Sequence, residues 1–165
     1  MRRKTLVSIL VLAVLVAFVP LSNAEMAKEG TASGTMIFSG TFKALPMGKE
    51  RLEMAFEVLG AYVGEGPLNH SSFRCVGAFH AVNGEFLNET GSCLFTTPNG
   101  DQAFSTYECA GHVGRSARGT FKWVGGTGKL TGMQGEGKFE RYNVRPAAEG
   151  TMQGYAQTKG SWKLP

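Results

Sequence analysis

Residues 124–137 read VGGTGKLTGMQGEG. This glycine-rich run has two interpretations, a phosphate-binding loop of a nucleotide-binding protein or a structural connection in an all-β protein. A P-loop needs a glycine five positions before the glycine of its Gly-Lys pair, and counting back from Gly128 that position is Trp123. Leu130 follows Lys129 where magnesium would require Ser or Thr, and Thr131 stands where the dinucleotide fingerprint needs glycine. We therefore interpret the run as structural, because glycine allows positive φ and close approach between strands. Its glycines are Gly125, Gly126, Gly128, Gly132, Gly135 and Gly137.

The segments on both sides of this run alternate apolar and polar residues and are bounded by turn residues, which is the pattern of short β-strands. Evenly spaced short strands are typical of a barrel or a sandwich, and a barrel of about eight strands has room for side chains or one small ligand. In the second strand the apolar residues change from even-numbered positions, up to Val58, to odd-numbered positions, from Leu59 onward, with Gly60 at the switch in parity. This change predicts either a β-bulge or the end of the strand at Gly60. We expect an all-β, eight-stranded antiparallel barrel with strands near residues 36–44, 51–63, 72–82, 89–97, 102–110, 119–124, 137–144 and 151–163.

Two stretches carry a family resemblance: GTFKWVGGTGKLTGMQGEGKFE at residues 119–140, with its GGTGK-x-x-G-x-x-G-x-G pattern, and CLFTTPNGDQ at residues 93–102. Both resemble hairpins of the allene oxide cyclase and dirigent-like β-barrels, and especially small bacterial secreted proteins of this type. The resemblance covers about residues 70–142, half of the chain. It implies a calycin-like, eight-stranded antiparallel barrel with a small-molecule cavity. Plant cyclases of this fold isomerise an oxylipin epoxide, and dirigent proteins steer phenolic radical coupling, but no motif carries their functional residues onto this chain.

The first 24 residues, MRRKTLVSILVLAVLVAFVPLSNA, predict a signal-peptide helix, because a basic start precedes an apolar run and small residues. We expect cleavage between Ala24 and Glu25 and export to the periplasm or the exterior of a bacterium. The alternative is an uncleaved anchor, but the apolar run is shorter than the roughly 20 residues that span a bilayer. Cleavage would remove three of the 17 basic residues and none of the 13 acidic ones, leaving 14 basic and 13 acidic residues. No Lys/Arg cluster then remains, which excludes a nucleic-acid partner.

The remaining length suits one domain. All 23 glycines of the chain follow residue 24, which is typical of many tight turns. We expect a flexible segment at residues 25–33, a single barrel domain at 34–165 and no membrane span in the mature protein.

Three cysteines in an exported protein predict one disulfide and one free thiol. If the Asn83-Gly84 hairpin is centred on Gly84, the numbers of directly opposed residues add up to 168, as those of Cys75 and Cys93 do. This register predicts a Cys75–Cys93 disulfide and leaves Cys109 as a buried thiol. A two-residue turn at Asn83-Gly84 would shift the register by one residue and remove this argument.

Few side chains suggest a reaction. The histidines lack metal-ligand spacing, so we expect structural or surface roles for them, with neither a metal nor a cofactor. Glu57, Tyr107 and Glu108 are the candidates for ligand-binding or acid–base residues in the lumen, although the solvent face of a strand is the simpler place for them.

Three functions remain open. The first is an exported barrel that binds a small hydrophobic molecule, the second an isomerase or cyclase acting on an oxylipin-like substrate, and the third a structural or interaction protein with a filled barrel. A cavity of several hundred Å³ with one or two convergent polar groups would favour the first two. A lumen packed solid by side chains would exclude both.

Overall fold

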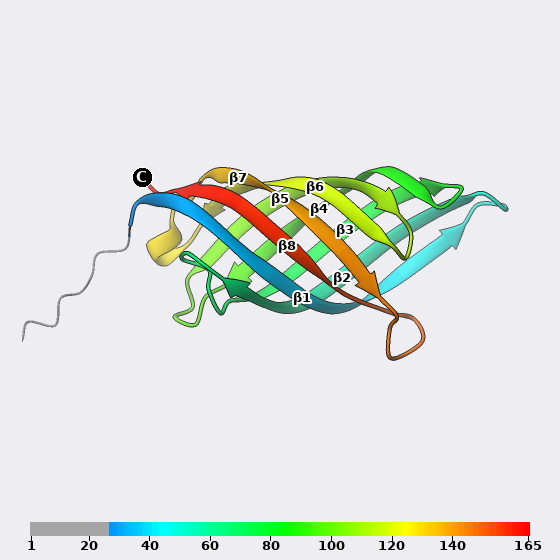
Figure 1. Cartoon of the computed structure of the whole chain (residues 1–165), viewed down its shortest axis with the longest axis horizontal. Coiled ribbons are helices and arrows are strands. Elements are labelled where there is room, and N and C mark those ends of the chain that lie inside the picture. Colours follow the sequence, from blue (N-terminus) through cyan, green and yellow to red (C-terminus); the bar gives the residue numbers. More distant parts are fainter. Residues whose placement is uncertain (1–26) are drawn as a thin grey trace, which may run out of the picture.

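The computed structural model describes residues 27–165, so the predicted signal peptide at 1–24 and its cleavage site, Ala24 and Glu25, lie outside the described residues. The described chain forms a closed barrel of eight antiparallel strands that follow one another in sequence order, which confirms the predicted fold class (Figure 1). The start of the first strand and the C-terminus lie at the same end of the barrel (Figure 1). The elements are β1 (Glu29–Pro46), β2 (Arg51–Gly64), β3 (Ser72–Val82), β4 (Glu85–Thr96), β5 (Gln102–His112), β6 (Ser116–Gly126), the 3₁₀ helix η1 (Gly128–Leu130), β7 (Gly135–Val144) and β8 (Thr151–Lys163).

The first strand begins earlier than the sequence suggested. Residues 29–33, which we expected to be flexible, belong to β1 and pair with β8 from Glu29 opposite Lys163 onward. This part of β1 turns small residues inward and therefore lacks the apolar alternation that marks a strand. Gly30 leaves room for the ring of Trp162, because a Cβ there would lie 3.2 Å from a ring carbon.

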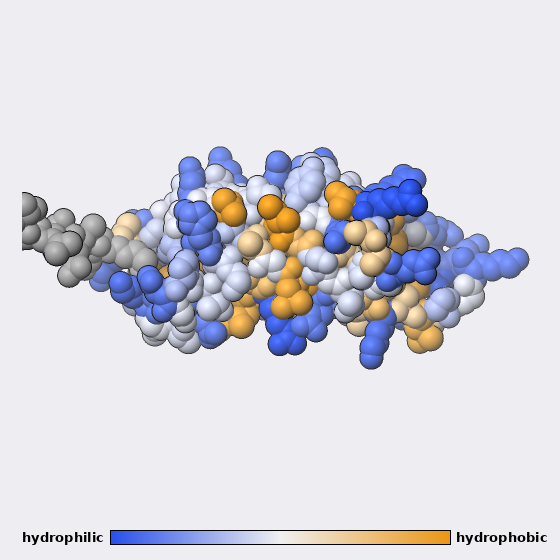
Figure 2. Space-filling view, turned by 90° about the horizontal axis from the view of Figure 1, so that it is seen from below, coloured by the Kyte–Doolittle hydropathy of each residue, from blue (hydrophilic) through white to orange (hydrophobic). Residues whose placement is uncertain are grey.

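The parity switch at Gly60 is neither a bulge nor a strand end. β2 continues in register against both neighbours past Gly60, and Tyr62 faces the lumen. Leu59 and Val63 point outward instead and are about half exposed, at 54% and 48%. The sequence pattern was misleading because apolar side chains also occupy the outer face, as Figure 2 shows for one side of the barrel. Within residues 27–165, no helix has the length and apolar character needed to cross a membrane.

The inner face explains part of the high glycine content. Gly77 on β3 and Gly91 on β4 lie opposite each other, and the ring of Tyr107 from β5 covers them. A Cβ at Gly91 would lie 2.5 Å from carbon atoms of that ring, and a Cβ at Gly119 would lie 2.8 Å from the ring of Phe139. A narrow lumen accepts large aromatic rings only where the neighbouring strand has no side chain.

The β3–β4 hairpin confirms the predicted disulfide, although by an unexpected route. Asn83 and Gly84 both have positive φ and form a two-residue turn, so Val82 lies opposite Glu85. That turn alone would have put the two cysteines out of register. An extra residue in β4, between Phe86 and Glu89, shifts the pairing with both neighbouring strands by one position. The bulge restores the register, and Cys75 lies opposite Cys93 and is bonded to it.

The glycine-rich run connects β6 to β7, as the sequence indicated, and η1 forms part of the connection. Leu130 and Met133 of this segment are each only 1% exposed and close one end of the barrel. Gly126 and Gly137 allow close approach, since an added Cβ would meet the Leu130 carbonyl and the Phe121 ring respectively. The other predicted glycines, which have positive φ, are Gly125, Gly128, Gly132 and Gly135.

Candidate ligand site in the barrel lumen

Of the three predicted lumen residues, only Tyr107 faces the lumen. Glu108 is its neighbour on β5 and is exposed on the outer face, because successive side chains of a strand point to opposite faces. Glu57 also lies on the outer face, where its carboxylate accepts a hydrogen bond from Arg74 Nε at 2.5 Å. The placement of Glu57 and Glu108 in the lumen was therefore wrong.

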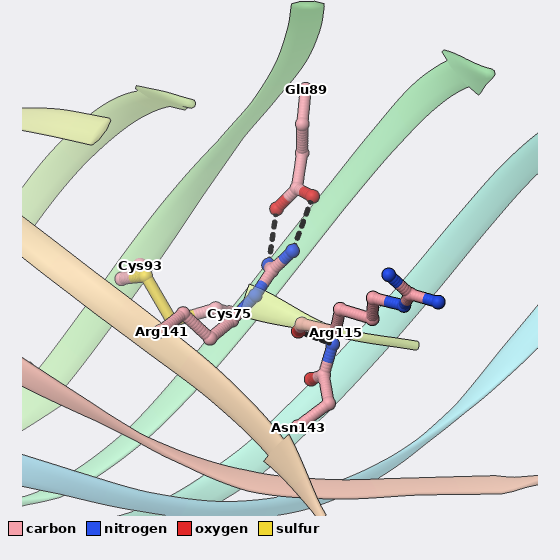
Figure 3. Close-up of polar contacts among 6 residues, drawn as sticks. All are labelled: Cys75, Glu89, Cys93, Arg115, Arg141 and Asn143. Carbon is pink, nitrogen blue, oxygen red and sulfur yellow. Dashed lines mark hydrogen bonds and ion pairs between the residues drawn. A yellow bond between two sulfur atoms is a disulfide. The ribbon is translucent and has the colours of Figure 1, made fainter. Parts of the chain in front are cut away.

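The charged groups inside the barrel are Glu89 and Arg141, neither of which was predicted. Arg141 projects from β7 across the lumen to Glu89 on β4 (Figure 3). Nη1 and Nη2 donate to the two carboxylate oxygens at 2.5 and 2.8 Å, the bidentate geometry that suits guanidinium and carboxylate. Glu89 is completely buried and Arg141 is 9% exposed, so both charges are removed from water and depend on each other.

The β4 bulge is what turns Glu89 inward. Phe86 also faces the lumen, and in a regular strand a residue three positions later would face the opposite side. With one extra residue between them, both Phe86 and Glu89 point into the barrel, while the intervening Leu87 is 84% exposed. Arg141 faces inward by ordinary alternation with Phe139. Arg141 could therefore have been identified from the sequence, as a charged residue at an inward-facing position of its strand.

The groups around this ion pair hold their protons firmly. Burial, and secondly the charge of Glu89, raise the pKa of the Tyr107 phenol above its ordinary value. Burial and Glu89 likewise raise the pKa of the Cys109 thiol to about 12. Burial alone would lower the pKa of Arg141, but the hydrogen bonds and charge of Glu89 outweigh it and raise the pKa. At neutral pH the groups beside the ion pair are therefore a neutral phenol and a neutral thiol.

A cavity of about 110 Å³ lies between this ion pair and the barrel end at which β1 begins and the C-terminus lies (Figure 1). This volume is below the several hundred Å³ of a typical drug-sized site, and is of the order of the engineered, roughly 150 Å³ apolar cavity that binds benzene. The residues with polar groups in its wall are Arg141, Tyr107, Ser105, Tyr62, Glu65, Thr158, Ser161 and, through its indole N–H, Trp162. The remaining wall is mainly apolar and includes Phe38, Val58, Phe73, Phe95, Trp123, Met133, Met152, Ala156, Trp162 and the Cys75–Cys93 disulfide.

The β2–β3 loop covers the outer end of the cavity. Leu68 of this loop is 5% exposed and lines the cavity together with Pro67. Glu65 also lines it and is exposed, so the cavity reaches the surface beside this loop. The loop is held by hydrogen bonds, since the amide of Glu65 donates to the Ser33 carbonyl at 2.8 Å and the amide of Ser71 donates to the Leu68 carbonyl at 3.1 Å.

The histidines lie away from the cavity. His80 on β3 contacts Glu53 on the outer face, and His70 is exposed in the β2–β3 loop. The Nδ1 atom of His112 lies 3.0 Å from the Val113 carbonyl oxygen. In residues 27–165 no group of three or more His, Cys, Asp or Glu side chains comes together to hold a metal ion.

Comparison of the chain with protein-family models, curated proteins and solved structures finds no match. The barrel and its lumen therefore carry the functional argument by themselves.

Proposed function

We propose that this protein binds a small, largely apolar molecule inside its barrel. The observation that carries the proposal is the cavity of about 110 Å³, walled mainly by aromatic, methionine and aliphatic side chains and bounded at its inner end by Arg141. Burial of an apolar molecule there removes its surface from water at roughly 25 cal/mol per Å². The expected relation to allene oxide cyclase and dirigent-like barrels belongs to this proposal, because proteins of both kinds act on hydrophobic substrates.

Catalysis is the second candidate, and the side chains favour binding over it. Acid–base catalysis needs a group that gains and loses a proton near neutral pH. Burial keeps the protons on Tyr107 and Cys109, and the carboxylate of Glu89 is engaged by two hydrogen bonds from Arg141 and lies outside the cavity wall. The cavity can hold and orient a molecule, and the side chains around it are poorly suited to moving protons.

Export is part of the same proposal. Disulfides persist in oxidising compartments, and the Cys75–Cys93 bond fits such a compartment. The apolar start of the chain indicates the same route. A binding barrel in the periplasm or outside the cell would act as a carrier or a scavenger of its ligand.

The experiment that tests binding uses the methionine methyl groups. Met36, Met133 and Met152 line the cavity, whereas Met47 lies outside it and is 49% exposed. In NMR spectra of protein labelled at the methionine methyls, toluene should shift the three cavity signals saturably, with a dissociation constant of about 0.1–1 mM. The Met47 signal should stay in place.

A variant and a matched control complete this test. Ala156 lines the cavity on β8, so Ala156→Leu should fill it and abolish the saturable shifts. Ala55→Leu adds the same atoms at an exposed position of β2 and should leave binding unchanged. Shifts that do not saturate, or that are the same in both variants, would show that the cavity does not bind the probe.

A further inference from the structure

We propose that the ligand carries an uncharged hydrogen-bond acceptor, such as a carbonyl or ether oxygen, and that this acceptor binds the Nε–H group of Arg141. The inference rests on the proposed function and specifies the chemical class of its ligand. The ligand would be a small ketone, ester or ether, with its apolar part toward the barrel end and its oxygen toward the ion pair.

The ion pair leaves one buried donor atom of Arg141 without a partner in the described part of the chain. Arg141 is 9% exposed and its guanidinium uses Nη1 and Nη2 for Glu89, but the buried Nε has no hydrogen-bond partner among the described residues. An unpaired buried donor costs free energy that a bound acceptor would recover. Arg141 belongs to the cavity wall, so a bound molecule lies against this side chain.

The charge balance of the lumen disfavours an anionic ligand. The positive charge of Arg141 is already matched by Glu89, which is fully buried and held by two hydrogen bonds of 2.5 and 2.8 Å. A carboxylate ligand would add a second negative charge to an apolar cavity whose arginine charge is already matched by Glu89. Burying an unmatched charge is far more costly than burying a neutral oxygen. The ion pair therefore selects a neutral acceptor over an anion.

The size and the surroundings of the cavity limit the ligand further. A cavity of about 110 Å³ holds a single ring or a short chain. The hydroxyl-bearing residues Tyr107 and Ser105 line the same cavity and can add hydrogen bonds near the inner end. Apart from groups such as the indole N–H of Trp162, which also has no partner among the described residues, the rest of the wall offers mainly apolar contacts, so a ligand with a polar atom at its inner end suits the site.

The test compares three ring compounds of similar shape by the methionine-methyl titration. Cyclohexanone has a neutral acceptor, methylcyclohexane has the same number of non-hydrogen atoms and no acceptor, and cyclohexanecarboxylate is an anion. We expect cyclohexanone to bind about tenfold more tightly than methylcyclohexane, which is the effect of one hydrogen bond to a charged donor, and the carboxylate to bind most weakly.

Two double variants locate the preference. Arg141→Met with Glu89→Leu removes the donor without leaving an unpaired buried charge, and should reduce the ratio of ketone to hydrocarbon affinity by about tenfold. Arg118→Met with Glu140→Leu makes the same substitutions in an ion pair on the outer face of β6 and β7 and should leave the ratio unchanged.

The outcomes separate the two proposals. If no probe binds the wild-type protein saturably, the proposed function fails and this inference fails with it. If methylcyclohexane binds as tightly as cyclohexanone, if the carboxylate binds most tightly, or if the double variant at Arg141 and Glu89 keeps the ketone preference, the barrel binds ligands but the assignment of the acceptor to Arg141 is overturned.

Discussion

Removal of Arg141 alone should destabilise the barrel far more than removal of both partners of its ion pair. In Arg141→Met the carboxylate of Glu89, which is 0% exposed, loses the two hydrogen bonds from Arg141 and its counter-charge. Breaking a buried pair in this way costs about 3–5 kcal/mol. Replacing both residues, as in Arg141→Met with Glu89→Leu, removes the desolvation penalty together with the attraction and should return the stability to within about 2 kcal/mol of wild type.

Urea denaturation followed by tryptophan fluorescence measures these free energies of unfolding, because a domain of this size is expected to unfold in one transition. The outer pair of Arg118 and Glu140 provides the control. Its side chains are 81% and 30% exposed, so Arg118→Met should not measurably lower the free energy of unfolding. A decrease in the free energy of unfolding of less than about 1 kcal/mol in Arg141→Met would refute the predicted cost of an unpaired Glu89. A double variant as unstable as the single variant would refute it as well.

Three further predictions concern packing, the disulfide and pH. Gly91→Ala should lower the free energy of unfolding by about 3 kcal/mol or more, because its Cβ would lie 2.5 Å from the ring of Tyr107. Gly100→Ala, at a φ of 87° and with nothing within 4 Å of the added Cβ, should lower it by about 1 kcal/mol in the same urea assay. Equal losses would contradict the packing argument. Replacing Cys75 and Cys93 by alanine should lower the free energy of unfolding by about 3 kcal/mol, and treatment of wild type with a reductant should reproduce the loss; a stability unaffected by both changes would show that the bond contributes nothing. Because the pKa of Cys109 is raised from 9.0 to about 12, the folded protein keeps a proton that the unfolded chain loses, so the stability contributed by this thiol is present below pH 9 and is lost as the pH rises toward 12. Cys109→Ala should reduce the slope of unfolding free energy against pH in this window by up to about 1.4 kcal/mol per pH unit, and parallel profiles for the two proteins would disprove the assignment.

Local patterns were sufficient for the architecture. Alternation of apolar residues and turn sequences such as Asn83-Gly84 identified the strands, and β3 and β8 have the predicted bounds. Features that depend on the neighbouring strand were harder to predict. The start of β1 at Glu29 is stabilised by pairing with β8, and the outward Leu59 and Val63 are tolerated because the closed sheet already fixes which face is inside.

The candidate site was predicted only in part because its residues were chosen by type and not by parity. Tyr107 and Glu108 are adjacent and could not both face the lumen of a regular strand. Arg141 shares its parity with Phe139 and could have been found by that criterion. Glu89 could not, because the β4 bulge that turns it inward has no clear mark in the sequence. The same bulge brought Cys75 opposite Cys93, so the disulfide was predicted correctly from a register that the turn by itself would not produce.

The ion pair of Glu89 and Arg141 divides the lumen into two parts with different packing. On one side the rings of Phe79 and Phe86 stack at 4.6 Å, and the guanidinium of Arg141 lies 5.9 Å from the ring of Phe86. On the other side lies the cavity, whose wall includes Arg141 but neither of those rings nor Glu89. A bound molecule therefore contacts the edge of a buried ion pair that is packed against Phe86 on its other side. Such a wall is preorganised, so binding there requires little ordering of the protein, and the affinity depends on how well the ligand fills the cavity and pairs Nε.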